Sequence, residues 1–477
     1  MNDGADMQLQ QPARVLATPG QLLSLALVVS ALLYARLVWF DAVNGWRPVL
    51  TFLGILATLF AIYAMAACVV ARADAGCGVL WIVLTGALLF RLILLPAGLP
   101  NDAGWPGLWD GLRMDLAGQA VVYEQFQLYD DDIWRYLWDG HVWAQGVNPY
   151  QYAPDDQRLD TLAGHSELWN VVRANIQFED TPTIYPPLAQ AVFRLSHMLR
   201  PGSVLVMKAV VVFFDMLAVL FLALALRQSG RPVTHVILYA WNPLVVKVFA
   251  GSGHVDAALV AAIAALAYCL GRRARMWAAI SFALAILAKL SPLILAPFVL
   301  RRIGWRYALV VAGVVFAGYL PFLDAGAGLF AGFRQFAREW QFNAGPFMLA
   351  RYLTGWTGAG PFAARALCGL LIIAMAVWLW RRDDGGADNF AQYAALTLGA
   401  LLVLSPAVMP WYLTWILPPG ILARQTVWLW FSALVCLAFL VMADETERPV
   451  VLALEYGALA VLLWRRRAET FSEQTKS

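Results

Sequence analysis

The sequence predicts an all-α polytopic membrane protein with about 14 transmembrane helices and one long extracytoplasmic loop. Of the 477 residues, 61% are hydrophobic and only 14% are charged, whereas a soluble domain carries about a quarter charged residues. Apolar runs of bilayer length recur along the chain, and Trp, which prefers membrane interfaces, occurs 21 times. The net charge of +3 is small and no basic block alternates with aromatic residues, so we expect no nucleic-acid partner.

Most apolar runs are long enough to cross a bilayer as single helices. The candidate spans are 21–40, 48–71, 78–97, 203–227, 232–250, 254–270, 305–323, 361–380, 390–408, 425–443 and 449–465. Shorter or Pro-interrupted runs lie near 275–290, 291–300 and 411–423. The first run is long enough to span, so we interpret it as a retained helix rather than a signal peptide. The five cysteines show no CxxC spacing, which is typical of small buried hydrophobic residues.

Arginine clusters in short loops predict the orientation, because such loops stay on the cytoplasmic side. These clusters lie at 227–231, 272–275, 301–306, 381–382 and 465–467. With an even number of spans, they share the cytoplasmic side with both termini. The predicted parts are a cytoplasmic N-terminus with three helices (1–97), an extracytoplasmic catalytic loop (98–202), the remaining bundle with a second outer loop near 324–360 (203–465), and a cytoplasmic tail (466–477). We therefore expect a multi-pass protein of the cytoplasmic (inner) membrane whose active site faces the periplasm or exterior.

The long outer loop contains the segment YDDDIWRYLWDGHVWAQGVNPYQYAP at 129–154. Asp132, Arg135, Tyr136 and Asp139 follow helical spacing, which predicts an amphipathic helix lying at the membrane interface. One acid of the run could simply cap this helix, since Asp accepts from free N–H groups at a helix start. Alternatively, a carboxylate could act as general base on a hydroxyl. The candidates for that role are Asp132 and its neighbour Asp131.

Three further charged residues interrupt apolar runs. Lys289, in AILAKLSPLILAP, either snorkels to the interface or points its ammonium group at a phosphate. His254 and Asp256, in AGSGHVDAALVAA, either mark a helix start or bind a phosphate or acceptor oxygen. Arg135 is a third available cation near the acids.

Aromatic and amide side chains supply the remaining candidates for substrate contact. Trp411 and Tyr412 in PWYLTW fit an aromatic belt, but such rings also stack on sugars. Asn343 in FNAGPF could equally be a turn residue. The candidate substrate-binding residues are Tyr136, Asp139, Tyr150, Tyr185, Asp256, Asn343, Trp411 and Tyr412. The sequence contains no HExxH, GxSxG, Walker loop or GxGxxG before a helix, which excludes those catalytic and nucleotide sites.

The motifs DDxxRYxWDG, GxNPYxYAP, PTIYPPLAQ, GHxDA, AKLSP and PWYLTW occur in this order between about Phe90 and Pro418. This series resembles bacterial GT-C integral membrane glycosyltransferases, in particular polyprenyl-phosphate-mannose-dependent mannosyltransferases. The resemblance implies that an Asp of the first long outer loop, here Asp132, is the catalytic base, and that Lys289 serves the donor phosphate. Two departures are Met409, where relatives often carry His, and three spans before the acidic loop, where many relatives have one.

The implied reaction is inverting transfer of a sugar, such as mannose, from a polyprenyl-phosphate donor to a hydroxyl of a glycan or glycolipid acceptor. The chemistry requires cations near the phosphate and a carboxylate near the incoming hydroxyl, for which Lys289, Arg135, His254 and Asp132 are available. A transporter or flippase of lipid-linked sugars is the alternative, although no internal repeat supports it.

We expect no cofactor. Adjacent acids could hold a divalent cation, but neighbouring side chains on a helix point apart. The oligomeric state stays open.

Overall fold

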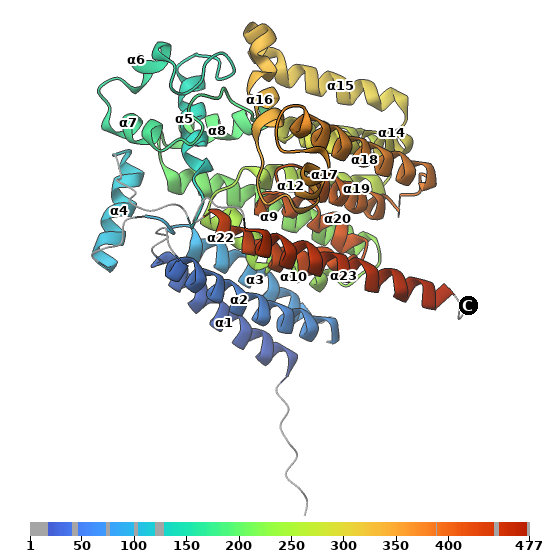
Figure 1. The fold of residues 1–477 in the computed structure, drawn as a ribbon. Coiled ribbons are helices and arrows are strands. Elements are labelled where there is room, and N and C mark those ends of the chain that lie inside the picture. Colours follow the sequence, from blue (N-terminus) through green and yellow to red (C-terminus); the bar gives the residue numbers. More distant parts are fainter. Residues whose placement is uncertain are drawn as a thin grey trace, which may run out of the picture.

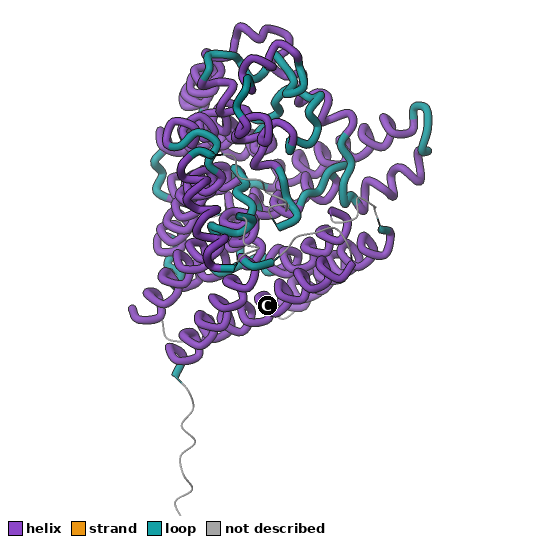
Figure 2. Tube along the Cα trace, turned by 90° about the vertical axis from the view of Figure 1, so that its left-hand side faces the viewer, coloured by secondary structure: helices purple, strands orange, loops and turns teal. Residues whose placement is uncertain are grey.

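The computed structural model describes residues 18–40, 46–72, 77–99, 104–119, 128–387, 389–442 and 448–474. These residues form helices joined by loops, with no strand among them (Figures 1 and 2). Phe342 and Ala407 form an isolated parallel bridge within this part of the chain. The prediction of an all-helical architecture is therefore confirmed for the described residues.

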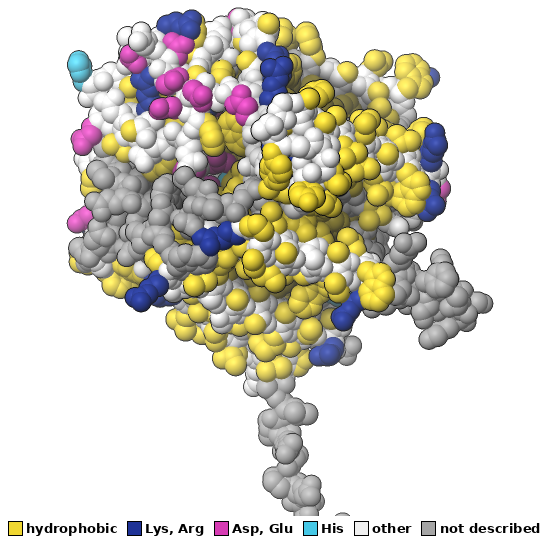
Figure 3. Space-filling view, viewed as in Figure 1, with side chains coloured by type: hydrophobic (Ala, Val, Ile, Leu, Met, Phe, Trp, Pro, Cys, Tyr) yellow, Lys and Arg dark blue, Asp and Glu magenta, His cyan; other side chains and the backbone are white. Residues whose placement is uncertain are grey.

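The first helices lie together at the lower end of the molecule in Figure 1, and a second group lies at its upper left. The lower group consists of α1 (Pro19–Val38), α2 (Trp46–Arg72) and α3 (Cys77–Leu94). Residues 98–202, the predicted outer loop, contain α4 (Trp105–Ala117), α5 (Asp132–Ala144), the 3₁₀ turn η1 (Gln157–Leu159), α6 (Asp160–Ala163), α7 (Glu167–Ala174) and α8 (Pro187–Leu199). Acidic side chains gather on the surface of this upper region, whereas the lower surface is largely apolar (Figure 3).

The remaining elements form the larger part of the bundle. They are α9 (Val204–Gln228), η2 (Val233–Val236), α10 (Ile237–Ala240), α11 (Pro243–Val246), the π-helix η3 (Lys247–Gly251), α12 (Asp256–Gly271), α13 (Arg275–Ala288), η4 (Ser291–Leu295), α14 (Ala296–Ile303), α15 (Trp305–Tyr319), η5 (Leu320–Phe330), α16 (Ala331–Glu339), α17 (Gly345–Thr354), α18 (Gly360–Arg382), α19 (Phe390–Leu404), η6 (Pro410–Trp415), α20 (Leu417–Leu422), α21 (Val427–Leu434), η7 (Val435–Ala438), α22 (Phe439–Met442) and α23 (Pro449–Gln474).

The predicted count of about 14 spans is not confirmed. Five helices of the described chain are long and apolar enough to cross a membrane, namely Pro19–Val38, Arg47–Arg72, Val204–Gln228, Trp305–Glu339 and Gly360–Arg382. A sixth span is Val233–Ala240 with Pro243–Gly251, if this pair, bent by 60°, is counted as one. Other predicted runs form shorter apolar helices of 10–17 residues. Multi-pass membrane insertion is supported, while the number of crossings stays a prediction.

Helix α12 is the central helix of the bundle. It packs against α9 and α13, and thirteen of its sixteen residues are buried. Its sequence, DAALVAAIAALAYCLG, is rich in alanine, and small side chains let neighbouring helices approach closely inside a membrane protein. The start of α12, at Asp256, is therefore fixed deep in the fold. This position matters because the predicted site residues His254 and Asp256 lie there.

Helix α5 forms at the place predicted, but its position as an amphipathic interfacial helix is not confirmed. Nine of its thirteen residues are buried, including Asp139 on the face that was expected to be polar and exposed. The helix packs against α8, α7 and α9. Helical spacing predicted that the polar face of α5 would be exposed to solvent. In the structure, polar groups of this face bond to one another, and neighbouring segments cover them.

A buried ion pair joins three elements of the bundle. The guanidinium group of Arg91, in α3, contacts the carboxylate of Asp215, in α9, and both side chains are fully buried. Tyr239, next to the end of α10, donates its hydroxyl to Asp215 Oδ1 at 2.8 Å. Arg91 also donates to the carbonyl of Ala240 at 2.8 Å. Charges inside an apolar bundle need such partners, because an unpaired charge is very costly there.

We expect Asp215→Ala to destabilise the protein by about 3–5 kcal/mol, because it leaves the Arg91 charge buried without its partner. The measurement is thermal unfolding of the purified protein in detergent. Asp110→Ala is the matched control, since Asp110 and Arg113 form a pair that is 71% and 79% exposed, and exposed pairs contribute about 0–1 kcal/mol. Equal unfolding temperatures for the two variants would contradict a structural role for the buried pair.

Candidate active site

The acidic segment opens onto a cavity of about 650 Å³. Side chains from the outer segments and from the bundle line it together. The lining residues are Tyr129, Asp130, Asp131, Asp132, Arg135, Gln177, Phe178, Thr181, Ile184, Tyr185, Lys289, Phe336, Trp340, Gln341, Phe342, Met409, Trp411, Tyr412, Val441 and Met442. The cavity thus combines carboxylates, two cations and an aromatic wall, which is a composition suited to a polar substrate with a phosphate group.

The backbone turns sharply before α5 and points successive acids in different directions. Leu128 and Tyr129 have φ values of 55° and 63°, in the left-handed region that is uncommon for residues with a Cβ. Asp131 is the N-cap residue of α5, but its side chain makes no capping hydrogen bond. Asp130 Oδ1 instead accepts a long bond, 3.4 Å, from the backbone N–H of Asp132. Asp130 therefore caps the start of α5 only weakly, and the side chains of Asp131 and Asp132 lie in different environments from that of Asp130.

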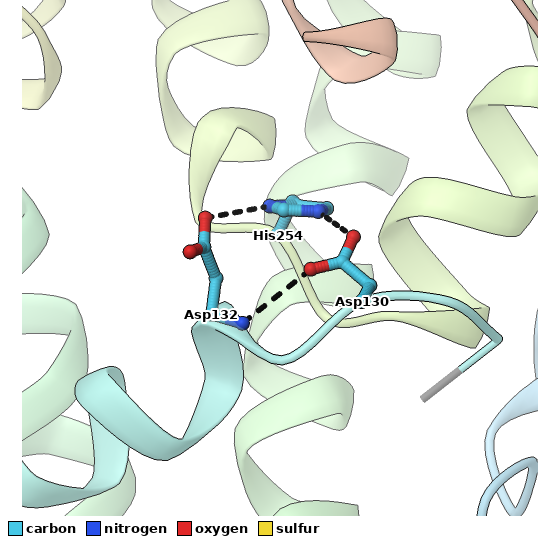
Figure 4. A group of neighbouring side chains, drawn as sticks. All are labelled: Asp130, Asp132 and His254. Carbon is cyan, nitrogen blue, oxygen red and sulfur yellow. Dashed lines mark hydrogen bonds and ion pairs between the residues drawn. The ribbon is translucent and has the colours of Figure 1, made fainter. Parts of the chain in front are cut away.

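Asp130, His254 and Asp132 form one cluster, shown in Figure 4. Asp130 contacts His254 Nε2 directly, and both side chains are buried. The opposite ring nitrogen, Nδ1, lies 3.6 Å from Asp132 Oδ2. The ammonium group of Lys247 lies 3.8 Å from Asp130 Oδ2, and the imidazole ring stacks on Trp411 with 3.8 Å between ring centroids. His254 is thus held on both ring edges and on one face.

A glycine allows this cluster to form. Gly253, in the GSGH turn between η3 and α12, has a φ of 78°. A Cβ atom there would lie 3.0 Å from both Ile133 Cδ1 and Lys208 Cγ. Only glycine combines the left-handed backbone with this close approach to α5. The turn therefore places His254 against the acids, although 122 residues separate His254 from Asp132 in the sequence.

The two carboxylates of the cluster have opposite electrostatic environments. Burial raises the pKa of the Asp132 carboxyl to about 6, with Asp130 and Asp256 adding to the rise and His254 and Lys289 opposing it. Burial also disfavours the charged form of Asp130, but His254 and Lys247 beside it outweigh this effect and lower its pKa. Asp130 is therefore a permanent anion near neutral pH. Asp132, whose side chain is 34% exposed, is the carboxylate that can exchange a proton in the cavity.

Asp130, Asp132 and His254 are the kinds of side chain that bind divalent cations, and their ligand atoms lie within 4.8 Å of one another. One ion at ligand distances of about 2.0–2.6 Å would need both carboxylates near the same imidazole nitrogen. Here the two carboxylates approach opposite nitrogens of the ring, and Lys247 already supplies positive charge to Asp130. The contacts within this cluster therefore run as a chain from Asp130 through the imidazole ring toward Asp132.

Lys289 lies in the cavity with its ammonium group surrounded by specific partners. It ends α13 and bonds Asp256 Oδ1 at 2.9 Å. The indole N–H of Trp415 donates to the same oxygen at 2.7 Å, and the ammonium group lies 4.2 Å from the ring centroid of Tyr412. With 22% of its side chain exposed, Lys289 can still meet a ligand in the cavity. Asp256 is buried behind it and orients it.

Arg135 is the second cation of the cavity. Its Nε donates to Asp139 Oδ1 at 2.8 Å, and Asp139 also accepts from Gln190 at 2.9 Å. The terminal nitrogen Nη2 has no hydrogen-bond partner within the described residues. Since the side chain is 11% exposed and lines the cavity, its guanidinium group has a donor available for a ligand. Asp139 lies behind Arg135 and does not line the cavity.

The predicted aromatic and amide residues divide between the cavity wall and the layer behind it. Tyr185, Trp411 and Tyr412 line the cavity, as do Phe178 and Trp340, which the sequence did not single out. Phe178 and Trp340 come from separate segments, with 4.2 Å between their ring centroids. Tyr136, Tyr150 and Asn343 are buried and do not line it. Tyr150 donates to the carbonyl of Tyr185 at 2.7 Å and supports that wall from behind.

Asn343 holds the second outer segment to the C-terminal helix. Its side-chain amide donates to Glu455 Oε2 at 2.7 Å, and the Tyr456 hydroxyl donates to its backbone carbonyl at 2.6 Å. The preceding residue, Phe342, bonds the backbone of Pro406 and Val408 and lines the cavity. Sequence analysis missed Glu455, although a lone acid in an apolar run is a signal for a buried polar contact.

Residues 125–304 match a family model described as alpha-(1->6)-mannopyranosyltransferase, N-terminal domain. This segment is therefore similar to a GT-C-type mannosyltransferase family. The resemblance seen in the motifs is therefore confirmed. The matched mannosyltransferase segment contains the acidic cluster, Arg135, His254 and Lys289, whereas Trp411, Tyr412 and Asn343 lie outside it. No curated protein matches the chain. The match and the apolar helices together support a membrane glycosyltransferase.

Proposed function

We propose that the protein transfers a hexose, mannose in the first instance, from a polyprenyl-phosphate donor to a hydroxyl of a glycan or glycolipid. The reaction takes place at the extracytoplasmic face of the cytoplasmic membrane and inverts the anomeric carbon. The observation that carries the proposal is the cavity in which Asp132, with a pKa of about 6, lies among Lys289, Arg135 and aromatic rings. The match to a mannosyltransferase family favours this reaction over transport of lipid-linked sugars.

Asp132 is the general base of the proposed reaction. A base works best when its pKa lies near the working pH and when it can reach the proton that it removes. Asp132 meets both conditions, since it lines the cavity and its pKa is raised. Asp130 is a weaker base, because His254 and Lys247 stabilise its anionic form and so reduce its affinity for a proton. Asp131 also lines the cavity and is the neighbouring candidate.

Lys289 and Arg135 bind the donor phosphate. Negative charge develops on the phosphate oxygens as the bond to the sugar breaks, and cations fixed in advance stabilise that charge. Lys289 is oriented by Asp256, and Arg135 is oriented by Asp139 while its Nη2 faces no protein partner in the described chain. These two cations serve the leaving group. His254 is enclosed by the acidic cluster and serves the base instead of the phosphate.

The cavity walls suit the rest of the two substrates. Aromatic rings such as Tyr412, Trp411 and Trp340 offer flat faces for sugar rings. The apolar side chains of Met409, Val441 and Met442 also line the cavity and offer a surface for the polyprenyl chain. Arginine-rich short loops favour the cytoplasmic side, and with an even number of spans this cavity would then face the outer side, where nucleotide sugars are absent and lipid-linked donors are available.

We expect Asp132→Asn to abolish sugar transfer while donor binding stays nearly unchanged, because the amide cannot take the proton. Transfer of labelled mannose from polyprenyl-phosphate mannose is the measurement. In the wild type, the rate should fall as the pH drops through about 6, since protonated Asp132 is not a base. Wild-type turnover in Asp132→Asn but not in Asp131→Asn would move the base by one residue, and turnover in both would refute a carboxylate base.

We expect Lys289→Ala to weaken donor binding by about 10-fold or more, whereas Lys289→Arg should retain most of the affinity, because a cation opposite the phosphate is what matters. Titration of each folded variant with polyprenyl-phosphate mannose provides the measurement. The uncharged polyprenol is the control ligand and should bind all variants alike. The same donor affinity in Lys289→Ala as in the wild type would show that this lysine does not serve the phosphate.

Cysteine labelling tests the sidedness of the cavity. A cysteine introduced at Ser166, beside α7, should react with an impermeant reagent in intact cells, and one at Ser472, near the C-terminus, should react only after lysis, because arginine-rich loops stay in the cytoplasm. The unchanged chain, in which Cys68 is exposed, gives the background labelling. The reverse pattern would place the acids in the cytoplasm, where a nucleotide sugar could be the donor.

A further inference from the structure

We propose that Tyr136 and His254 form a proton relay behind Asp132, and that Asp130 is the anion that orients this relay and balances the charge it gains. The inference rests on the proposed glycosyl transfer and deepens it by assigning the route of the proton. None of these three side chains needs to touch the sugar. Each acts on the reaction through Asp132, whose carboxylate faces the cavity.

The Tyr136 hydroxyl lies between the base and the imidazole. It donates to Asp132 Oδ2 at 3.4 Å, and its oxygen lies 3.3 Å from His254 Nδ1. Asp132 Oδ2 and His254 Nδ1 are 3.6 Å apart, so the hydroxyl is closer to each of them than they are to one another. The Tyr136 ring stacks on Phe193 at 4.6 Å and meets the edge of Tyr185 at 5.1 Å. Because these contacts fix the ring, the hydroxyl stays in position to connect the two groups.

Asp130 determines which nitrogen of His254 is free. Its carboxylate contacts Nε2 directly, so Nε2 carries the hydrogen and Nδ1 presents its lone pair to the Tyr136 hydroxyl. Lys247 lies 3.8 Å from Asp130 Oδ2, and its ammonium group has no hydrogen-bond partner in the described parts of the chain. In the resting state, the charges of Asp130 and Lys247 therefore offset each other, and Asp132 carries the remaining negative charge of the site.

The proton balance of the reaction then closes within the cluster. The acceptor O–H bond breaks, and its oxygen forms the bond to the anomeric carbon of the sugar. The bond from that carbon to the phosphate oxygen breaks, and its electron pair leaves with the polyprenyl phosphate. The proton goes to Asp132, which passes it to the Tyr136 oxygen as the proton of Tyr136 moves to His254 Nδ1. Asp132 is a carboxylate again, and the new cation lies against Asp130. After the products leave, the proton returns by the same route to water in the cavity.

Other charged groups also face the cluster and set its balance. From α9, Lys208 packs its stem on Gly253 and donates to the carbonyl of Ala97 at 2.6 Å. From the start of α12 and the end of α13, Asp256 and Lys289 form a pair at 2.9 Å. On α5, Arg135 is paired with Asp139. Each of these groups has a partner, so Asp130 and Lys247 are the charges whose removal changes the field at His254 most directly.

The pH dependence of kcat/KM separates this relay from a structural role. The reaction uses a synthetic polyprenyl-phosphate mannose as donor and octyl mannoside as acceptor. Asp130→Asn removes negative charge, so the relay binds its proton less tightly and the acid limb of the profile should move to lower pH. Lys247→Met removes positive charge and should move the limb to higher pH. A role in packing alone would lower activity without moving the limb in opposite directions.

Tyr136→Phe breaks the relay but keeps the ring contacts, so it should lower kcat by about 10- to 100-fold with KM nearly unchanged, within the usual effect of general base catalysis. Tyr393→Phe is the control, since Tyr393 donates to the carbonyl of Arg382 away from the cavity. Thermal unfolding and donor titration establish that each variant is folded. If Asp130→Asn fails to fold, Lys247→Met and Tyr136→Phe still carry the test.

The outcomes distinguish the relay from the proposed function. The relay would be overturned if Tyr136→Phe kept the wild-type kcat and Lys247→Met left the acid limb of the pH profile unmoved. If Asp132→Asn were inactive in the same series, the proposed glycosyl transfer would still stand. If the wild type transfers no mannose from this donor, or if Asp132→Asn keeps its rate, the proposed function and the relay both fail.

Discussion

The site depends on one constraint, namely that a charge buried in an apolar bundle must have partners. Asp130 is buried, and it contacts His254 directly with Lys247 nearby. These partners belong to the η3–α12 region, whereas Asp130 precedes α5 on an outer segment. Losing either partner would leave an uncompensated charge, which costs several kcal/mol. The same contacts that neutralise Asp130 therefore fix the outer segment to the bundle and place Asp132 at the cavity.

The cavity is built from segments that are distant in the sequence and are held by close backbone contacts. Gly332, in α16, lies against the 182–183 backbone, where a Cβ atom would come within 2.1 Å of the Pro182 carbonyl oxygen. Glu455 and Tyr456, on α23, hold Asn343, and Asn148 donates to the carbonyl of Phe322 at 3.1 Å. Two outer segments and the C-terminal helix thus fix one another, so the aromatic wall has a defined position.

The sequence predicted the features that depend on local pattern. Apolar periodicity predicted helices where helices occur, and the acidic run, Arg135, Lys289 and the PWY motif all lie at one cavity. The number of crossings stays unconfirmed, and the predicted run 232–250 forms a pair of helices bent by 60°, with Pro243 at the start of the second. Helical spacing placed Asp139 on a solvated face, whereas the fold covers that face and pairs Asp139 with Arg135.

Contacts between distant segments could not be read from local pattern. The pairs Asp215–Arg91 and Glu455–Asn343 connect residues that are far apart, and only the fold brings them together. A lone acid within an apolar run signals that such a partner exists without naming it. Likewise, local pattern did not separate the roles of the three consecutive acids, and only the family resemblance pointed to Asp132.

The fold makes this assignment through environment. Asp130 and Asp132 are two residues apart and chemically identical, yet cations beside the first lower its pKa, while burial and neighbouring carboxylates raise that of the second to about 6. Pairs of titratable groups whose environments separate their pKa values are typical of acid–base catalysis. His254 lies between the two and contacts each through a different nitrogen. The cluster therefore places an anion, an imidazole and an exchangeable carboxylate in series, which is the arrangement on which the proposed proton route depends.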